Sequence, residues 1–188
     1  MLGDALSFLI DALVQPFAAI LLFRFHAVWL KAPMRNPIGE FLMAITDFVV
    51  LRVRRFMPAV WGLDSATLLL AFVVEFIYLG LFLWLQGYAF QPFLVLGLLA
   101  WTAVKLLKIS FYLLVATLIA EAILSWVNPH TLIAPMLGAV NHPFVQPLRR
   151  RIPPVGNVDL SVLVLLLICQ LILIVPIAGL EQAVQRLL

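Results

Sequence analysis

The sequence predicts an all-α membrane protein: a polytopic membrane helical bundle of about four transmembrane helices in two tandem parallel repeats, with interfacial or re-entrant helices in the loops. The first observation is composition, since 65% of the 188 residues are hydrophobic and only 11% are charged. A compact soluble domain of this size cannot hide so much apolar side chain from water. The second observation is a set of long apolar runs, and the third is a basic motif that occurs twice between them.

The apolar runs predict the spans. A membrane helix needs about 20 mostly apolar residues to cross ~30 Å of hydrocarbon. Four runs meet this requirement, at residues 6–29, 65–84, 109–127 and 160–180. A fifth run, at residues 88–104, carries no charge but is shorter, and it ends at Lys105 and Lys108. It could cross the membrane, re-enter it, or lie along the interface as the lead-in to the third span.

Charged residues predict how the runs are oriented, because short loops rich in lysine and arginine stay on the cytoplasmic side of the membrane. Four spans would put both basic loops in the cytoplasm and both termini outside, whereas five spans would separate the basic loops across the membrane. We therefore expect four spans. The loop after the first run carries Lys31, Arg35, Arg52, Arg54 and Arg55, and the loop after the third carries Arg149, Arg150 and Arg151.

An internal repeat supports this organisation. A shift of 95 residues lays RVRRFMPAVWGLDSA, residues 52–66, on PLRRRIPPVGNVDLS, residues 147–161. A duplication explains the match, and it divides the chain into a first repeat (1–90), a hydrophobic linker that is interfacial or re-entrant (91–107) and a second repeat (108–188). Because each repeat crosses twice, the halves should form a parallel pseudo-two-fold bundle. The identical pairs are Arg54 with Arg149, Arg55 with Arg150, Pro58 with Pro153, Val60 with Val155 and Asp64 with Asp159.

The doubled motif, Arg-Arg-x-x-Pro followed by Asp, leads into an apolar run in each half, and an Asn-Pro pair precedes it at residues 36–37 and 128–129. In these features the chain resembles the YggT family of bacterial inner-membrane proteins. The resemblance covers nearly the whole chain, although the glycine before the aspartate shifts from Gly62 to Gly156, one residue further ahead. It implies a multi-pass protein of the bacterial inner membrane, in which the basic loops predicted from charge would be cytoplasmic and the termini periplasmic. It also implies a role in osmotic-stress tolerance or, as in plastid relatives, in cytochrome assembly and nucleoid or division processes.

The repeated motif has a purely structural interpretation. Its arginines can anchor the loops at lipid phosphates, and Pro58 and Pro153 end any helix that precedes them. Asp64 or Ser65 can cap the span that follows the first motif, and Asp159 or Ser161 the span that follows the second, by accepting hydrogen bonds from free amides. Topology and capping then explain the motif without any activity.

A functional interpretation treats the two loops as one cytoplasmic patch, paired across the pseudo-axis. Such a patch would bind anionic phospholipid headgroups or the acidic face of a membrane-protein partner. Prolines stiffen the second loop, and Asn141-His142-Pro143 is expected to break it into two short interfacial helices. The contact residues would be Arg54, Arg55, Pro58 and Asp64 in the first loop, and Arg149, Arg150, Arg151, Pro153 and Asp159 in the second.

Polar residues inside the spans form a second group of candidates, because a charge at membrane depth is usually paired or faces water. Arg24 and Glu121 each lie five residues before a tryptophan, so a salt bridge between the halves is expected. Glu75 lies 11 residues into its span, about 16 Å at helical rise and near the midplane. Its counterpart in the repeat is Gln170. Glu75 is either a protonated or hydrogen-bonded carboxyl that holds helices together, or an ion or proton site.

Other function classes receive no support from the sequence. It has no catalytic motif or phosphate loop, and its single cysteine, Cys169, excludes an internal disulfide and a cysteine-based zinc site. No cofactor is expected, and nucleic acid is a poor partner for basic residues set between apolar runs. We therefore expect a non-enzymatic adaptor or assembly and stress-tolerance factor, as a monomer or a homo-oligomer, that docks envelope proteins or anionic lipid in the bilayer. The alternative is an ion or osmolyte transport component that uses Glu75 and Arg24.

Overall fold

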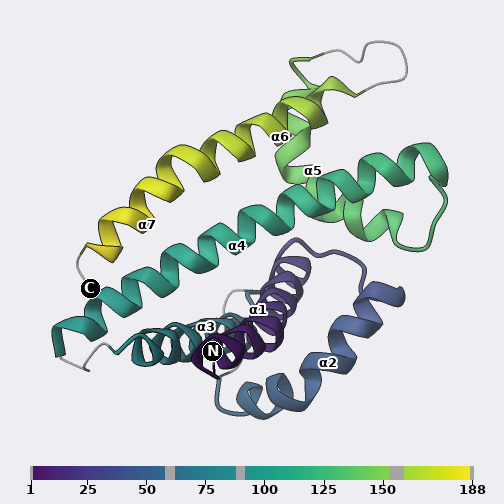
Figure 1. The fold of residues 1–188 in the computed structure, drawn as a ribbon. Helices are drawn as coiled ribbons and strands as arrows, with labels where there is room; N and C mark the ends of the chain where they lie inside the picture. Colours follow the sequence, from purple (N-terminus) through teal and green to yellow (C-terminus); the bar gives the residue numbers. More distant parts are fainter. Residues whose placement is uncertain (1, 58–61, 88–91, 153–158, 187–188) are drawn as a thin grey trace.

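The computed structural model describes residues 2–57, 62–87, 92–152 and 159–186, and the elements in these ranges are all helices (Figure 1). Each half contains a long helix, a shorter helix and a second long helix. The last long helix is a continuous rod of three pieces, since α6 passes through a π-helical turn, η1, into α7. The elements are α1 (Leu2–Trp29), α2 (Pro37–Arg54), α3 (Ser65–Leu85), α4 (Pro92–Val127), α5 (Ala134–Arg149), α6 (Leu160–Ile172), η1 (Leu173–Ile177) and α7 (Ala178–Gln185).

Four helices are long and apolar enough to cross a membrane. The fold class is thus confirmed as an all-helical membrane protein of four spans in two tandem halves. The π-helical turn in the last span contains Pro176, whose missing N–H interrupts the regular bonding of an α-helix. The spans are Leu6–Trp29, Ser65–Leu85, Val95–Val127 and Leu160–Gln185.

The fifth apolar run neither crosses by itself nor re-enters within the described residues. From Pro92 onward it is the first part of α4, one unbroken helix of 36 residues that is about 54 Å long at helical rise. Lys105 and Lys108 looked like a boundary in the sequence, but they lie inside this helix. The Lys108 ammonium pairs with Glu181 of α7 at 2.5 Å, so the charge does not interrupt the rod.

The shorter helix of the first half, α2, begins at a well-formed cap. The Asn36 side chain accepts hydrogen bonds from the amides of Ile38 (3.1 Å) and Gly39 (3.0 Å), and Pro37 fits the first helical position, where no amide bond is needed. Gly39 is required at this point, because a Cβ there would lie 2.1 Å from the Met34 carbonyl oxygen. The buried residues of α2 recur every three or four positions, so one face packs on the bundle: Gly39, Leu42, Thr46 and Val50.

The shorter helix of the second half, α5, is continuous from Ala134 to Arg149 although it contains Pro143 and Pro147. The predicted break at residues 141–143 is therefore wrong. Asn141, the first residue of that stretch, is buried and bonds to two side chains of α4. Each of the two prolines removes one backbone hydrogen bond of the helix, and the side-chain bonds of Asn141 to Thr117 and Glu121 fix this part of α5 to α4.

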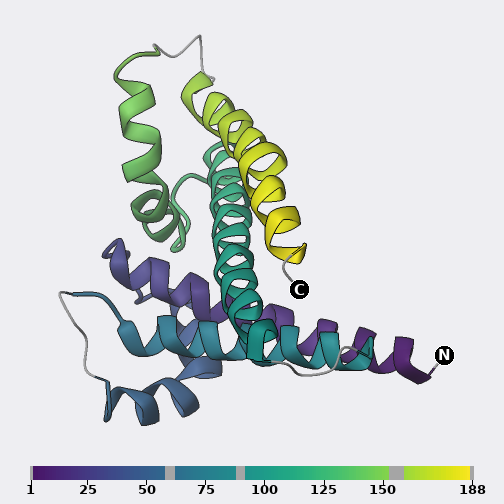
Figure 2. The same cartoon turned by 90° about the vertical axis from the view of Figure 1, so that its left-hand side faces the viewer.

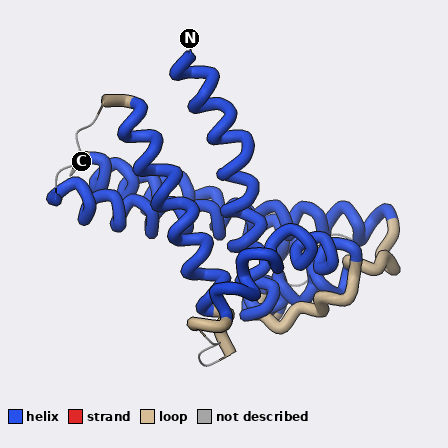
Figure 3. The backbone as a smooth tube through the Cα atoms, turned by 90° about the horizontal axis from the view of Figure 1, so that it is seen from below, coloured by secondary structure: helices blue, strands red, loops and turns tan. Residues whose placement is uncertain are grey.

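The two halves cross instead of lying side by side. In Figure 2 the hairpin of α1 and α3 runs across the hairpin of α4 and α6–α7 at a wide angle, so the pseudo-two-fold bundle is not the arrangement observed. The first part of α4 packs across α3 through an apolar cluster of Tyr78, Leu79, Leu83, Leu98 and Trp101, and this contact sets the crossing. Figure 3 shows the N-terminal end of α1 projecting away from the body, which agrees with the exposed side chains of Phe8 and Leu13.

Candidate functional site

The first basic turn is held by an ion pair between Arg54, at the end of α2, and Asp64, at the start of α3. The guanidinium donates two hydrogen bonds to the carboxylate, Nη2 to Oδ2 at 2.5 Å and Nε to Oδ1 at 3.3 Å. Asp64 is only 2% exposed. It also caps α3, since it accepts from the Thr67 hydroxyl at 2.6 Å and the Thr67 amide at 3.4 Å. Gly62 supports the turn with a φ of 79°, which an L side chain rarely adopts.

Charge keeps this pair ionised. Burial by itself would raise the pKa of Asp64, but the hydrogen bonds and charge of Arg54 and the bonds from Thr67 outweigh burial and lower that pKa below its ordinary value. The hydrogen bond to Asp64 raises the pKa of Arg54 in turn. The turn is therefore a permanent ion pair at neutral pH, not a free arginine and a free aspartate.

The second basic turn repeats the arrangement with less burial. The Nε of Arg149 donates to Oδ2 of Asp159 at 2.6 Å, and Asp159 accepts from the Ser161 amide at 3.0 Å, so it caps α6. Burial would raise the pKa of Asp159, but the Arg149 hydrogen bond and the cap lower it overall. Of the two candidates predicted for each cap, the aspartate is the N-cap in both turns, Asp64 before α3 and Asp159 before α6. Pro58 and Pro153 lie outside the described residues.

The motif arginines have different surroundings. Two of them form ion pairs with the aspartate of the same turn, Arg54 with Asp64 and Arg149 with Asp159. The other three are exposed and pair with no carboxylate among the described residues: Arg55, Arg150 and Arg151. The sequence predicted all five as contact residues. The ion pairs could have been predicted from the spacing, since arginine and aspartate are ten residues apart in both turns.

The two turns do not form one patch within a chain. Figures 1 and 2 place the end of α2 and the end of α5 at different corners of the molecule. The predicted single patch is wrong for this reason: the hairpins cross, and crossing carries their connecting turns apart. Each turn is a separate basic surface.

The expected salt bridge between Arg24 and Glu121 is absent. The buried Arg24 donates Nη1 to Asp47 at 2.6 Å and to the Thr46 hydroxyl at 2.5 Å, both on α2. Glu121 accepts from the Asn141 amide at 2.6 Å, on α5. The shorter helix of each half packs on the long helix before it, so it supplies a polar partner closer than the other half does.

These two polar contacts are equivalent in the repeat. Thr46 and Asn141 are separated by the same 95 residues that relate the two motifs, and each meets the polar residue of the preceding long helix. In the second half Thr117 of α4 also donates to Asn141 at 2.7 Å. The duplication therefore preserved the place of the contact, while the residues that make it changed.

Glu75 lies in a third polar group, between α1 and α3. Its side chain is 0% exposed, Oε1 accepts from Gln15 at 3.1 Å, and Oε2 has no partner among the described residues. One turn further along α3, the Tyr78 hydroxyl donates to Asp11 at 2.6 Å, and Lys105 of α4 stands 5.9 Å from the centre of the Tyr78 ring. Glu75 thus joins helices by a hydrogen bond, as one of its two predicted roles requires.

Gln170, the repeat counterpart of Glu75, is exposed on α6. Within the described part of the chain, no side chain is hydrogen-bonded to Gln170 as Gln15 is to Glu75. Arg24 also lies outside the Glu75 group, because it follows Gln15 by nine residues on α1, about 14 Å along the helix. Among the residues that the structure describes, no three His, Cys, Asp or Glu side chains are grouped so as to hold a metal ion.

Comparison with known proteins matches both halves. A family model described as CCB3/YggT matches residues 3–85 and 100–180. The uncharacterized protein YggT of Escherichia coli K12 is 30% identical over 171 residues, which cover 90% of this chain and 87% of that protein. An uncharacterized protein of Vibrio alginolyticus, from the region 3' of proC, is 35% identical over 167 residues, or 86% of this chain and 88% of the relative. No solved structure matches.

Proposed function

The chain belongs to the CCB3/YggT family, and from this premise we propose that it is a non-enzymatic membrane adaptor or assembly and stress-tolerance factor. Its two basic turns dock anionic lipid headgroups or acidic envelope proteins at the cytoplasmic face of a bacterial inner membrane. The termini lie on the periplasmic side.

One observation carries the proposal: in each turn one motif arginine is ion-paired and the arginines that follow it are free of such a pair among the described residues. In each turn the first arginine is fixed to an aspartate ten residues later, and this pair sets the shape of the turn. The following arginines, Arg55 in one turn and Arg150 and Arg151 in the other, are left exposed. An exposed guanidinium on a braced turn is suited to phosphate or carboxylate, because it needs little further ordering to bind.

The surroundings of the first turn support attachment to a membrane surface. Phe56, next to Arg55, is 90% exposed, and Phe48 and Leu51 on α2 are more than half exposed. Apolar side chains beside arginines are typical of segments that lie in the headgroup region, where both kinds of side chain are satisfied. A single chain presents two separate basic turns, so a larger basic surface would require a homo-oligomer.

The test removes the free arginines and keeps the braced ones. The variant Arg55→Ala/Arg150→Ala/Arg151→Ala is crosslinked in cells, purified in mild detergent, and compared with the native chain for the proteins and anionic lipids that co-purify. A matched control, Arg35→Ala/Arg52→Ala/Arg186→Ala, removes three other exposed cations and therefore lowers the net charge by the same amount. We expect the first variant alone to lose its partners. Equal co-purification from both variants would overturn the proposal.

A second candidate function is an ion transport component, favoured by the Glu75 group. Glu75 is fully buried with one oxygen unpartnered among the described residues, and a carboxyl in that state within a span is a candidate ion site. Arg24 has no part in it, because Arg24 is bonded to α2. Ion flux into reconstituted vesicles that is lost in Glu75→Gln and kept in Glu40→Gln, an exposed control, would favour transport. Absence of flux from the native chain would remove this candidate.

A further inference from the structure

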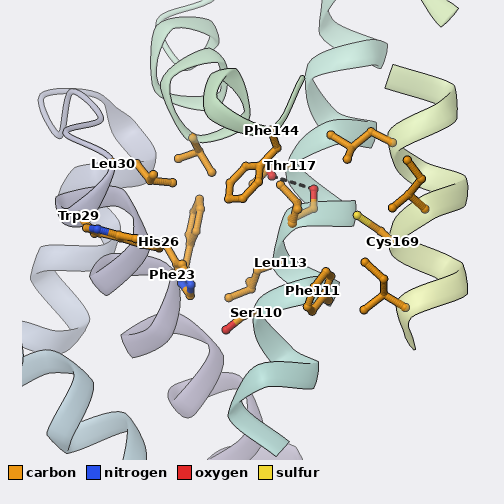
Figure 4. A pocket seen from close by; sticks show the side chains of 15 residues that line it. Phe23, His26, Trp29, Leu30, Ser110, Phe111, Leu113, Thr117, Phe144 and Cys169 are labelled. Carbon is orange, nitrogen blue, oxygen red and sulfur yellow. Dashed lines mark hydrogen bonds between the residues drawn. The ribbon is translucent and has the colours of Figure 1, made fainter. Parts of the chain in front are cut away.

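A groove of about 350 Å³ lies between the two halves (Figure 4). Side chains of α4 form its floor, those of α1 and α6 form its two sides, and α5 closes one end with Val140 and Phe144. α1, α4 and α6 all belong to candidate spans, so three walls of the groove are built from helices that are apolar enough to cross a membrane. Its volume is within the range of small-molecule sites in proteins.

Apart from the Trp29 indole at the opening and the weakly donating Cys169 thiol, the polar side chains that line the groove already donate their hydrogen within the protein. Nδ1 of His26 is 2.7 Å from the Leu22 carbonyl oxygen, so that nitrogen carries the ring proton and donates it there. The Ser110 hydroxyl donates to the Leu106 carbonyl at 2.8 Å, and the Thr117 hydroxyl is within 2.9 Å of two acceptors, the Leu114 carbonyl and Asn141. A ligand rich in carbonyl or phosphate oxygens would lose its hydration inside such walls without compensation.

The opening of the groove is different, because it borders a positive charge. Trp29, the last residue of α1, and Leu30 after it line the groove, and Lys31, exposed and with a φ of 53°, follows them directly. Trp29 is 48% exposed, as suits a tryptophan at the level of the headgroups. An apolar interior that ends beside an exposed ammonium is complementary to one kind of molecule, an apolar chain that carries an anion at its end.

We propose that the groove binds one acyl chain of an anionic phospholipid, with the phosphate of that lipid near Lys31. This site is distinct from the basic turns, and it does not depend on their proposed docking role. The lipid fills the space between the crossed halves, where no side chain of the described residues reaches.

Two substitutions on α6 test the site. Ile168 lines the groove, whereas Leu171 is 62% exposed and does not line it. Ile168→Trp should fill the groove, and Leu171→Trp is the matched control on the same helix. Native mass spectrometry is run on each protein in mild detergent with added phosphatidylglycerol or phosphatidylethanolamine. We expect the native chain and the control to retain one phosphatidylglycerol, and the groove variant to retain about tenfold less, since overpacking a filled site is unfavourable. Lys31→Gln should remove the preference for phosphatidylglycerol.

A second measurement leaves the groove intact. The chain has five tryptophans, and two variants keep only one each, Trp29 in the groove or Trp126, which is 75% exposed and does not line it. Phosphatidylglycerol with brominated chains, added at one lipid per protein, should quench Trp29 fluorescence and leave Trp126 nearly unchanged. Equal quenching of the two, equal lipid retention by both α6 variants, or a dimer that the groove variant abolishes in place of a bound lipid would each overturn the proposal.

Discussion

The carboxylate of Asp64 caps α3 and, from the same position, accepts two hydrogen bonds from the guanidinium of Arg54, ten residues earlier. One side chain thus fixes both the start of a span and the return of the chain from α2. Arg149 and Asp159 do the same for α6. A repeated motif that looks like a binding sequence is therefore, in part, the element that builds the turn.

Removing these aspartates should destabilise the two halves unequally. Asp64→Ala should lower the free energy of unfolding by about 2–3 kcal/mol, the sum of a lost cap and a lost charge-assisted hydrogen bond. Asp159→Ala should cost about 1 kcal/mol, because this pair is more exposed and such pairs contribute less. Unfolding in mixed micelles, followed by circular dichroism, measures both. Arg55→Ala, an exposed residue beside Arg54, is the control near the first cap, and equal losses at the two aspartates would contradict the role given to burial.

The same pairs make stability depend on acid pH. The pKa values of Asp64 and Asp159 are lower in the folded chain than in the unfolded one, so the unfolded state binds protons first as the pH falls. Their contribution is complete above the ordinary aspartate value of 3.8 and is lost as the pH drops through the lower folded values. When the pH is lowered from 5 to 2.5, the midpoint temperature of unfolding of the native chain should decrease. It should fall less in Asp64→Asn/Asp159→Asn, and an identical fall would show that other groups dominate.

Much of this fold could be predicted from the sequence, because the features concerned are local or repeated. Apolar length identifies the spans, and a side chain one position before a helix identifies a cap. The Arg54–Asp64 pair was also within reach, since its spacing and charges recur at Arg149 and Asp159. The end of the fifth apolar run at Lys105 and Lys108 was not the end of a helix. The charge of Lys108 is satisfied by Glu181, 73 residues away, and no local sequence pattern shows such a partner.

The partners of Arg24 and Glu121 could not be predicted for the same reason. Equal depth on equivalent helices made a bond between them plausible, but depth does not show where α2 and α5 fold back. Each short helix returns to the long helix before it and brings Asp47 or Asn141 into contact. The crossing of the halves likewise depends on the packing of α4 across α3, which is tertiary information.

A double-mutant cycle would separate the observed pair from the expected one. Substituting Arg24→Gln and Asp47→Asn singly and together should give a coupling energy of about 1–3 kcal/mol, as contacting charges in one network do. The cycle of Arg24→Gln with Glu121→Gln should give a coupling below about 0.5 kcal/mol, the level of independent sites. Unfolding free energies in the same micelles provide the values. Strong coupling of Arg24 with Glu121 and none with Asp47 would refute the assignment of partners.

The proposed orientation gives the last prediction, which uses the single native cysteine. In a Cys169→Ser background, new cysteines are placed at Arg55 and Arg150, in the two basic turns, and at Gln185, at the end of α7. Because eight of the twelve basic residues lie in the two loops before α3 and α6, those loops should stay in the cytoplasm. A membrane-impermeant maleimide should therefore label Gln185→Cys in intact cells, and should label Arg55→Cys and Arg150→Cys only after the membrane is opened. Labelling of one basic turn but not the other in intact cells would mean that the chain crosses an odd number of times between them, and four spans with both loops inside would be excluded.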